Sequence, residues 1–185
     1  SVKNLQPIEI WGISDQMLQI PRPSNNEEKI QDRPETPGKH MGMERPKDEA
    51  GNIITRNPAT PGMENRKGVV LQGHLDMVPQ KNSDKTHDFV TDPIEAVVDG
   101  EWVKANGTTL GADNGIGVSS AMAVLASQNS KHGPLEGLLS ATEETGMDGA
   151  NGLAPGILNG DILINLDSED EGELYVGCAG GEDVS

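Results

Sequence analysis

Three short, mostly apolar runs constrain the fold of this chain more than any other feature. They lie at residues 68–74, 135–141 and 161–166, and polar side chains stand at or just after the end of each. Apolar runs of this length are typical of strands buried on both faces, as in parallel sheets. Between the first two runs, residues 114–128 carry apolar side chains at helical spacing. This order predicts an α/β fold with a mostly parallel central sheet flanked by helices.

Weaker patterns predict further elements around this sheet. Residues 96–104 form a hairpin pattern around Asp99-Gly100, and residues 51–56 form a short strand pattern after a turn. Such dipeptides between apolar runs are typical of tight turns. Residues 173–176 suggest a last short strand, and residues 11–20 suggest a weak helix.

The amino-terminal third is much less regular. Eight of the twelve prolines fall within the first 61 residues. Because a proline inside a helix costs about 3 kcal/mol, we expect residues 21–50 to be loop or poorly ordered. Residues 57–67 read as another loop. The chain is therefore expected to divide into a Pro-rich, partly irregular portion at 1–67 and an α/β core at 68–185.

Charge and composition exclude several functional classes. The net charge is −16, and all of this excess lies in residues 68–185. An acidic surface disfavours binding to nucleic acids and to anionic membranes. One cysteine allows no intrachain disulfide, and no apolar run is long enough for a membrane span. We expect a cytoplasmic protein, whose carboxylates either form a solvated surface or converge on cations.

The polar residues at the ends of the apolar runs favour the second possibility, that carboxylates converge on cations. His74 and Asp76 follow the first run, Glu143 and Glu144 follow the second, and Asp167 follows the third, while Asp113 precedes the helix. Ligands of open α/β sheets bind at the carboxyl ends of the strands. Imidazole combined with carboxylates suits zinc, manganese or cobalt. Taken singly, these residues have simpler interpretations: Asp113 as a helix N-cap, and the glutamates as surface charge.

Four motifs together resemble the aminoacyl-histidine dipeptidases, which are co-catalytic di-zinc exopeptidases. The motifs are Gly73-His74-Leu75-Asp76-Met77-Val78-Pro79, Gly111-Ala112-Asp113-Asn114-Gly115, Thr142-Glu143-Glu144-Thr145-Gly146 and Asn165-Leu166-Asp167-Ser168-Glu169. The resemblance is dense from residue 50 to about residue 183 and looser over 11–28. It implies the amino-terminal part of a metallopeptidase catalytic domain, acting on dipeptides that typically end in histidine.

The resemblance also implies a role for each site residue. Two zinc ions, which cobalt or manganese can replace, would be held by His74 and Asp167 on the first, Glu144 on the second and Asp113 bridging both. Asp76 would stand behind His74 and fix its imidazole. Glu143 would be the general base that takes a proton from the attacking water. A cis peptide bond would join Asp113 to Asn114.

The chain also departs from this family. Members are longer: a lid domain through which they form homodimers follows roughly this point, and a returning segment supplies a histidine to the second zinc. His40, His87 and His132 match no family motif, and residues 30–47 lack the amphipathic helix expected there. We therefore expect the isolated chain to be weak or inactive.

Two alternatives to the dipeptidase remain open. The first is a non-catalytic acidic fragment that binds one divalent metal. The second is another exopeptidase of the superfamily, such as a tripeptidase, or an aminoacylase. Residues 147–150 and 78–81 favour the dipeptidase over the second alternative.

Overall fold

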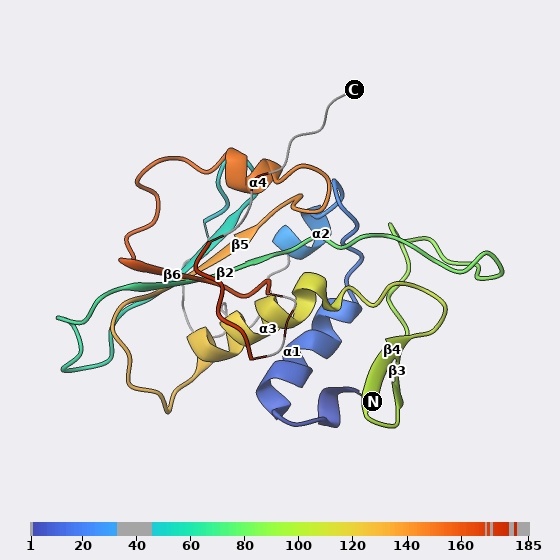
Figure 1. Cartoon of the computed structure of the whole chain (residues 1–185), viewed down its shortest axis with the longest axis horizontal. Coiled ribbons are helices and arrows are strands. Elements are labelled where there is room, and N and C mark those ends of the chain that lie inside the picture. The colour runs from blue at the N-terminus through green and yellow to red at the C-terminus, as the bar shows by residue number, and fades with distance from the viewer. Residues whose placement is uncertain (1, 33–45, 169, 171, 178–179, 181–185) are drawn as a thin grey trace.

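A four-stranded sheet lies at the centre of the computed structural model, which describes residues 2–32, 46–168, 170, 172–177 and 180 (Figure 1). Its strands are β1 (Ile53–Asn57), β2 (Val69–His74), β5 (Leu135–Ser140) and β6 (Ile162–Asn165), in the order β1-β5-β2-β6. β2 pairs in parallel with both β5 and β6, and β1 pairs antiparallel to β5. The predicted α/β class, with a mostly parallel sheet flanked by helices, is confirmed.

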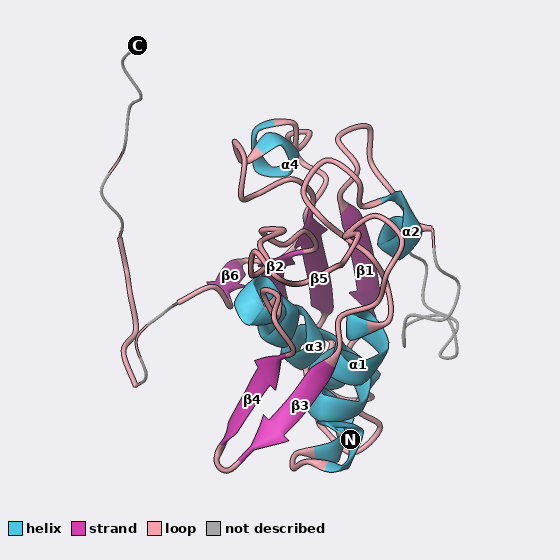
Figure 2. Cartoon of the chain, turned by 90° about the vertical axis from the view of Figure 1, so that its right-hand side faces the viewer, coloured by secondary structure: helices cyan, strands magenta, loops and turns pink. Residues whose placement is uncertain are grey.

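Two helices cover one face of this sheet. α3 (Ala112–Ala126) packs on β2 and β5, and α1 (Ile8–Leu18) packs against α3 (Figure 2). α1 begins directly after Pro7, where a fixed φ of −69° suits the start of a helix. The main apolar core lies between these helices and the sheet, with Met122, Leu125 and Leu139 fully buried.

The opposite face is covered by the segment that follows α4 (Asp148–Asn151). Leu153, Ile157 and Leu158 pack there on a small cluster of Ile54, Val70 and Leu138. A third cluster joins the 3-10 helix η1 (Val2–Asn4) and α1 to the predicted hairpin, whose strands are β3 (Ala96–Asp99) and β4 (Trp102–Ala105). The apolar core is thus divided among three modest clusters.

Three expectations need correction. The amino-terminal helix spans Ile8–Leu18, not 11–20, and Pro7 lies directly before its first residue. Within 21–50, a one-turn helix α2 (Glu28–Gln31) forms, buried through Ile30, and the expectation of disorder at 33–45 lies outside the described residues. Residues 173–176 form no strand: Leu174 and Val176 are 87% and 97% exposed, and no described strand pairs with them.

The register of the parallel strands aligns their carboxyl ends. His74 of β2 lies opposite Ser140 of β5, and Gln72 of β2 lies opposite Asn165 of β6. The segments that leave β2, β5 and β6 therefore emerge at one edge of the sheet. Within the part of the chain that the structure describes, no helix is long and apolar enough to cross a membrane.

A buried carboxylate holds the opposite end of the sheet together. Glu136, in β5, is 4% exposed and accepts hydrogen bonds from the backbone amides of Asn159 and Gly160, both at 2.7 Å. It also pairs with Arg56 Nε of β1 at 3.0 Å. The carboxylate thereby fixes the turn that leads into β6.

We predict that Glu136→Ala destabilises the chain by about 2 kcal/mol, because it leaves backbone donors in a poorly hydrated place without an acceptor. Urea unfolding followed by circular dichroism measures this change. Glu64→Ala is the matched control, since Glu64 accepts a backbone hydrogen bond from Gly62 at an exposed position. Equal unfolding midpoints for the two variants would contradict the role given to Glu136.

Candidate metal site

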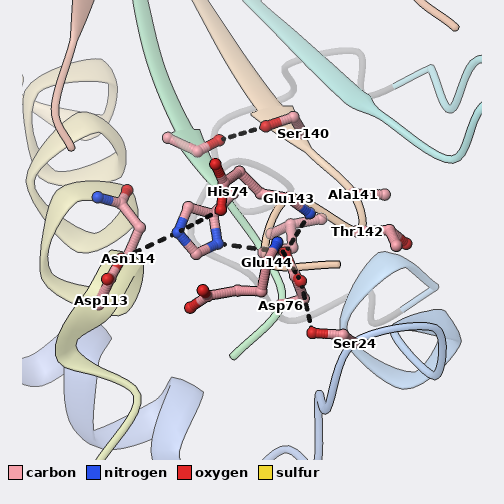
Figure 3. A network of polar contacts seen from close by, with 12 residues as sticks. Ser24, His74, Asp76, Asp113, Asn114, Ser140, Ala141, Thr142, Glu143 and Glu144 are labelled. Atoms are coloured by element: carbon pink, nitrogen blue, oxygen red, sulfur yellow. Dashed lines mark hydrogen bonds and ion pairs between the residues drawn. The ribbon is translucent and has the colours of Figure 1, made fainter. Parts of the chain in front are cut away.

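All six residues singled out in the sequence meet at the carboxyl edge of the sheet. His74 ends β2, Glu143 and Glu144 follow β5, and Asp167 follows β6. Asp113 reaches them from the start of α3, and Asp76 lies behind the histidine (Figure 3). Four segments far apart in the sequence therefore supply the site.

The imidazole of His74 is the centre of this cluster. The residue is 1% exposed, and its Nε2 lies 3.0 Å from Asp113 Oδ1, 3.7 Å from Asp167 Oδ1 and 4.0 Å from Glu143 Oε2. Ligand atoms of His74, Asp113 and Glu144 lie within 4.8 Å of one another, and so do those of His74, Glu143 and Asp167. The two groups share the histidine, so the whole cluster surrounds one small volume.

Asp76 holds the other side of the ring. Its Oδ1 lies 3.2 Å from His74 Nδ1, and it accepts hydrogen bonds from Ser24 Oγ at 2.7 Å and from the backbone amides of Glu143 and Glu144 at 3.0 and 3.2 Å. Burial alone would raise the pKa of this carboxyl. The hydrogen bonds outweigh burial and hold the pKa at about 2.

Four other groups of the site have raised pKa values, in contrast to Asp76. Burial would lower the pKa of His74, but its hydrogen bonds to Asp76 and Asp113 raise it to about 9. Burial raises the pKa values of Glu143, Glu144 and Asp167, and neighbouring carboxylates add to each rise. The site therefore crowds several carboxylates into a partly buried place, which is the electrostatic condition that a bound cation relieves.

The donor set fits a divalent metal. It offers one imidazole nitrogen whose ring is held from behind by a carboxylate, together with several carboxylate oxygens. That arrangement is characteristic of zinc, and also suits manganese and cobalt.

The start of α3 explains how Asp113 reaches the site. Gly111, just before this helix, has a φ of +69°, and the Asp113 carboxylate contacts His74 Nε2 at 3.0 Å, so Asp113 faces the site. Asp113 and Asn114 have non-helical backbone angles, and the peptide bond between them is cis, as the resemblance implies. The Asp113 side chain is 66% exposed and extends toward His74.

Sequence reasoning missed several residues that position this cluster. Asn114 Nδ2 donates to Asp167 Oδ1 at 2.6 Å and to the carbonyl of Leu166 at 2.7 Å, and so orients that carboxylate. Glu27 accepts hydrogen bonds from the backbone amide and the hydroxyl of Thr142, at 2.9 and 2.8 Å. Asn114 lies inside one of the four sequence motifs, whereas Ser24 and Glu27 have no local signal in the sequence.

Known proteins resemble this chain in both sequence and structure. Residues 70–181 match the model of peptidase family M20/M25/M40. The chain is 59% identical over 184 residues to the cytosol non-specific dipeptidase of Escherichia coli, covering all of this chain and 38% of that relative. The crystal structure of an aminoacylhistidine dipeptidase from Vibrio alginolyticus matches 96% of this chain and 36% of its own, at 55% identity and a TM-score of 0.92.

A tripeptidase from Staphylococcus aureus shares the fold, with a TM-score of 0.73 at 21% identity, over 88% of this chain and 43% of its own. This chain thus spans well under half the length of each of these relatives. The family model covers more than half of the chain, and the Escherichia coli relative aligns along all of it. The chain therefore belongs to peptidase family M20/M25/M40.

Proposed function

We propose that these residues form the metal centre of a dipeptidase. The observation that carries the proposal is the imidazole of His74, whose Nδ1 faces the buried Asp76 while its Nε2 faces Asp113, Asp167 and Glu143. A carboxylate behind a histidine fixes the ring and leaves the second nitrogen for a metal. The family membership agrees with this interpretation.

In this proposal zinc is the metal, with cobalt or manganese as substitutes. His74 and Asp167 would hold the first ion, Glu144 would hold the second, and Asp113 would be a ligand common to both. When bound, the cations would polarise the peptide carbonyl and make the attacking water more acidic. Ligand atoms of His74, Asp113 and Glu144 lie within 4.8 Å of one another, as do those of His74, Glu143 and Asp167, so the proposed ligands are close enough to share bound cations.

Glu143 acts as the general base in the proposed reaction. Its side chain is 31% exposed and reaches to 4.0 Å from His74 Nε2, so it borders the place where a cation would lie. Burial raises its pKa, which makes it a better proton acceptor than an ordinary glutamate. It would take the proton of the attacking water and deliver it to the leaving amine.

The proposed substrates are dipeptides, typically with a carboxyl-terminal histidine. The names of two relatives support this choice, since one is called a non-specific dipeptidase and the other an aminoacylhistidine dipeptidase. The match to the tripeptidase, at 21% identity, shows a common fold alone, so it is no argument that this chain acts on longer peptides.

We predict two zinc-binding events when the metal-free chain is titrated in a calorimeter. Asp113→Asn should weaken both by about tenfold or more, because it removes the shared ligand. Asp167→Asn should weaken only the first. Asp84→Asn, an exposed aspartate in a loop, is the matched control. One event would favour the non-catalytic fragment, and none would refute the metal centre.

The catalytic role is tested in a chimera in which this chain replaces the matching segment of the Escherichia coli relative. Glu143→Gln should lower the rate of β-alanyl-histidine hydrolysis by about 10²- to 10⁴-fold, because the general base is lost. Zinc affinity should remain within a fewfold of the parent. Glu101→Gln, at the exposed turn of the β3–β4 hairpin, should leave the rate unchanged.

The same chimera tests the substrate class. We expect it to cleave β-alanyl-histidine faster than a tripeptide or an N-acetyl amino acid. Faster cleavage of the tripeptide would favour a tripeptidase, and faster cleavage of the acetylated compound would favour an aminoacylase.

For the general base, undiminished hydrolysis by the Glu143→Gln chimera would show that another group takes the proton.

A further inference from the structure

Arg22 is a fully buried cation that has no place in the proposed reaction. The residue is 2% exposed and lies in the segment between α1 and α2. Its Nη1 donates to the carbonyl oxygens of Leu75 at 2.8 Å and Asp76 at 3.0 Å, and its Nη2 donates to that of Gly111 at 2.6 Å. One guanidinium thus joins the chain leaving β2 to the chain entering α3.

These two stretches carry the groups that meet at the metal site. His74 and Asp76 come from the first, and Asp113 comes from the second, two residues after Gly111. Farther from the site, backbone hydrogen bonds join the same two stretches, from Thr109 to Gln80 at 2.8 Å and from Asn82 to Gly107 at 2.9 Å. Beside the site residues themselves, the planar and rigid guanidinium constrains the separation through its three hydrogen bonds.

Two glycines leave the space that the guanidinium occupies. A Cβ atom on Gly111 would lie 2.6 Å from Arg22 Nη2, and one on Gly115 would lie 2.8 Å from it. The Gly115 position has no other close neighbour beyond the Arg22 guanidinium carbon at 3.7 Å. A methyl group at residue 115 would therefore displace the guanidinium and touch little else.

We propose that Arg22 is a positioning residue of the metal site, which sets the distance between His74 and Asp113. This inference rests on the proposed function, since it assumes that those two residues bind a common cation. Arg22 hydrogen-bonds to backbone carbonyls behind the site, and acts through the residues that it holds.

The sign of its effect on metal affinity distinguishes this role from that of a simple buried charge. A positive charge near Asp76, Asp113 and Glu144 repels a cation, so removing the charge alone would tighten metal binding. Removing a tether does the opposite, because the ligands lose their shared geometry. Loss of a group that orients metal ligands typically costs about 10- to 100-fold in affinity.

The test is a titration of the metal-free chain with cobalt(II), followed through its visible absorption. Arg22→Met should weaken cobalt binding by about tenfold or more and alter the absorption spectrum. Arg56→Met is the matched control, because Arg56 also donates to a backbone carbonyl, that of Ile157 at 2.6 Å, at the opposite end of the sheet. It should leave cobalt affinity and spectrum unchanged.

Gly115→Ala provides a second variant that keeps every polar group. It should weaken cobalt binding and alter the spectrum in the parent chain, but have no further effect in the Arg22→Met background. Because alanine favours a helix over glycine, this variant is expected to fold even if Arg22→Met does not.

The outcomes distinguish failure of the proposed metal centre from failure of the positioning role of Arg22. If the parent chain binds no cobalt, the proposed metal centre fails and the inference falls with it. If the parent binds cobalt while Gly115→Ala or a folded Arg22→Met variant binds as tightly or more tightly, the metal centre stands and the positioning role of Arg22 is refuted.

Discussion

The buried carboxylate of Asp76 is the group on which the geometry of the site depends. It hydrogen-bonds to His74, accepts the hydroxyl of Ser24 and accepts the two backbone amides at 143 and 144. These contacts come from three separate segments and keep the carboxylate ionised far below neutral pH. Because an anion faces Nδ1, a neutral His74 keeps its proton on that nitrogen and presents a free lone pair on Nε2.

Around this fixed anion, the site is electrostatically unfavourable without a cation. Burial and mutual repulsion raise the pKa values of Glu143, Glu144 and Asp167, while hydrogen bonds to Asp76 and Asp113 raise the pKa of His74. Carboxylates are crowded together here although like charges repel, and such exceptions to favourable charge placement are common at functional sites. The acidic excess of residues 68–185, which by itself left open a solvated surface or convergence on cations, is in part concentrated at this edge.

The sheet, the long helix and the meeting of the six candidate residues at one edge of the sheet could be predicted from the sequence. Apolar runs at 68–74, 135–141 and 161–166 mark strands by a local pattern, and a parallel sheet brings the residues after each strand to one edge. The strand expected at 173–176 shows the limit of such patterns, because a strand needs a partner that four residues cannot specify.

The residues that position the site could not be predicted in this way. Ser24 and Glu27 lie in a proline-rich stretch without periodicity, and they contact residues 52 and 115 positions away. Arg22 reaches Gly111 across 89 positions. Such contacts depend on how α1 and its following loop pack against the finished sheet, which no window of sequence contains.

The hydrogen bonds from residues 143 and 144 to Asp76 come from the backbone, not from the side chains. The loop after β5 is therefore tied to Asp76 through its main chain and not through the side chains at these two positions. Replacing either side chain with any residue except proline leaves both backbone donors present. The support of Asp76 and the carboxylates beside His74 thus come from different atoms of the same two residues.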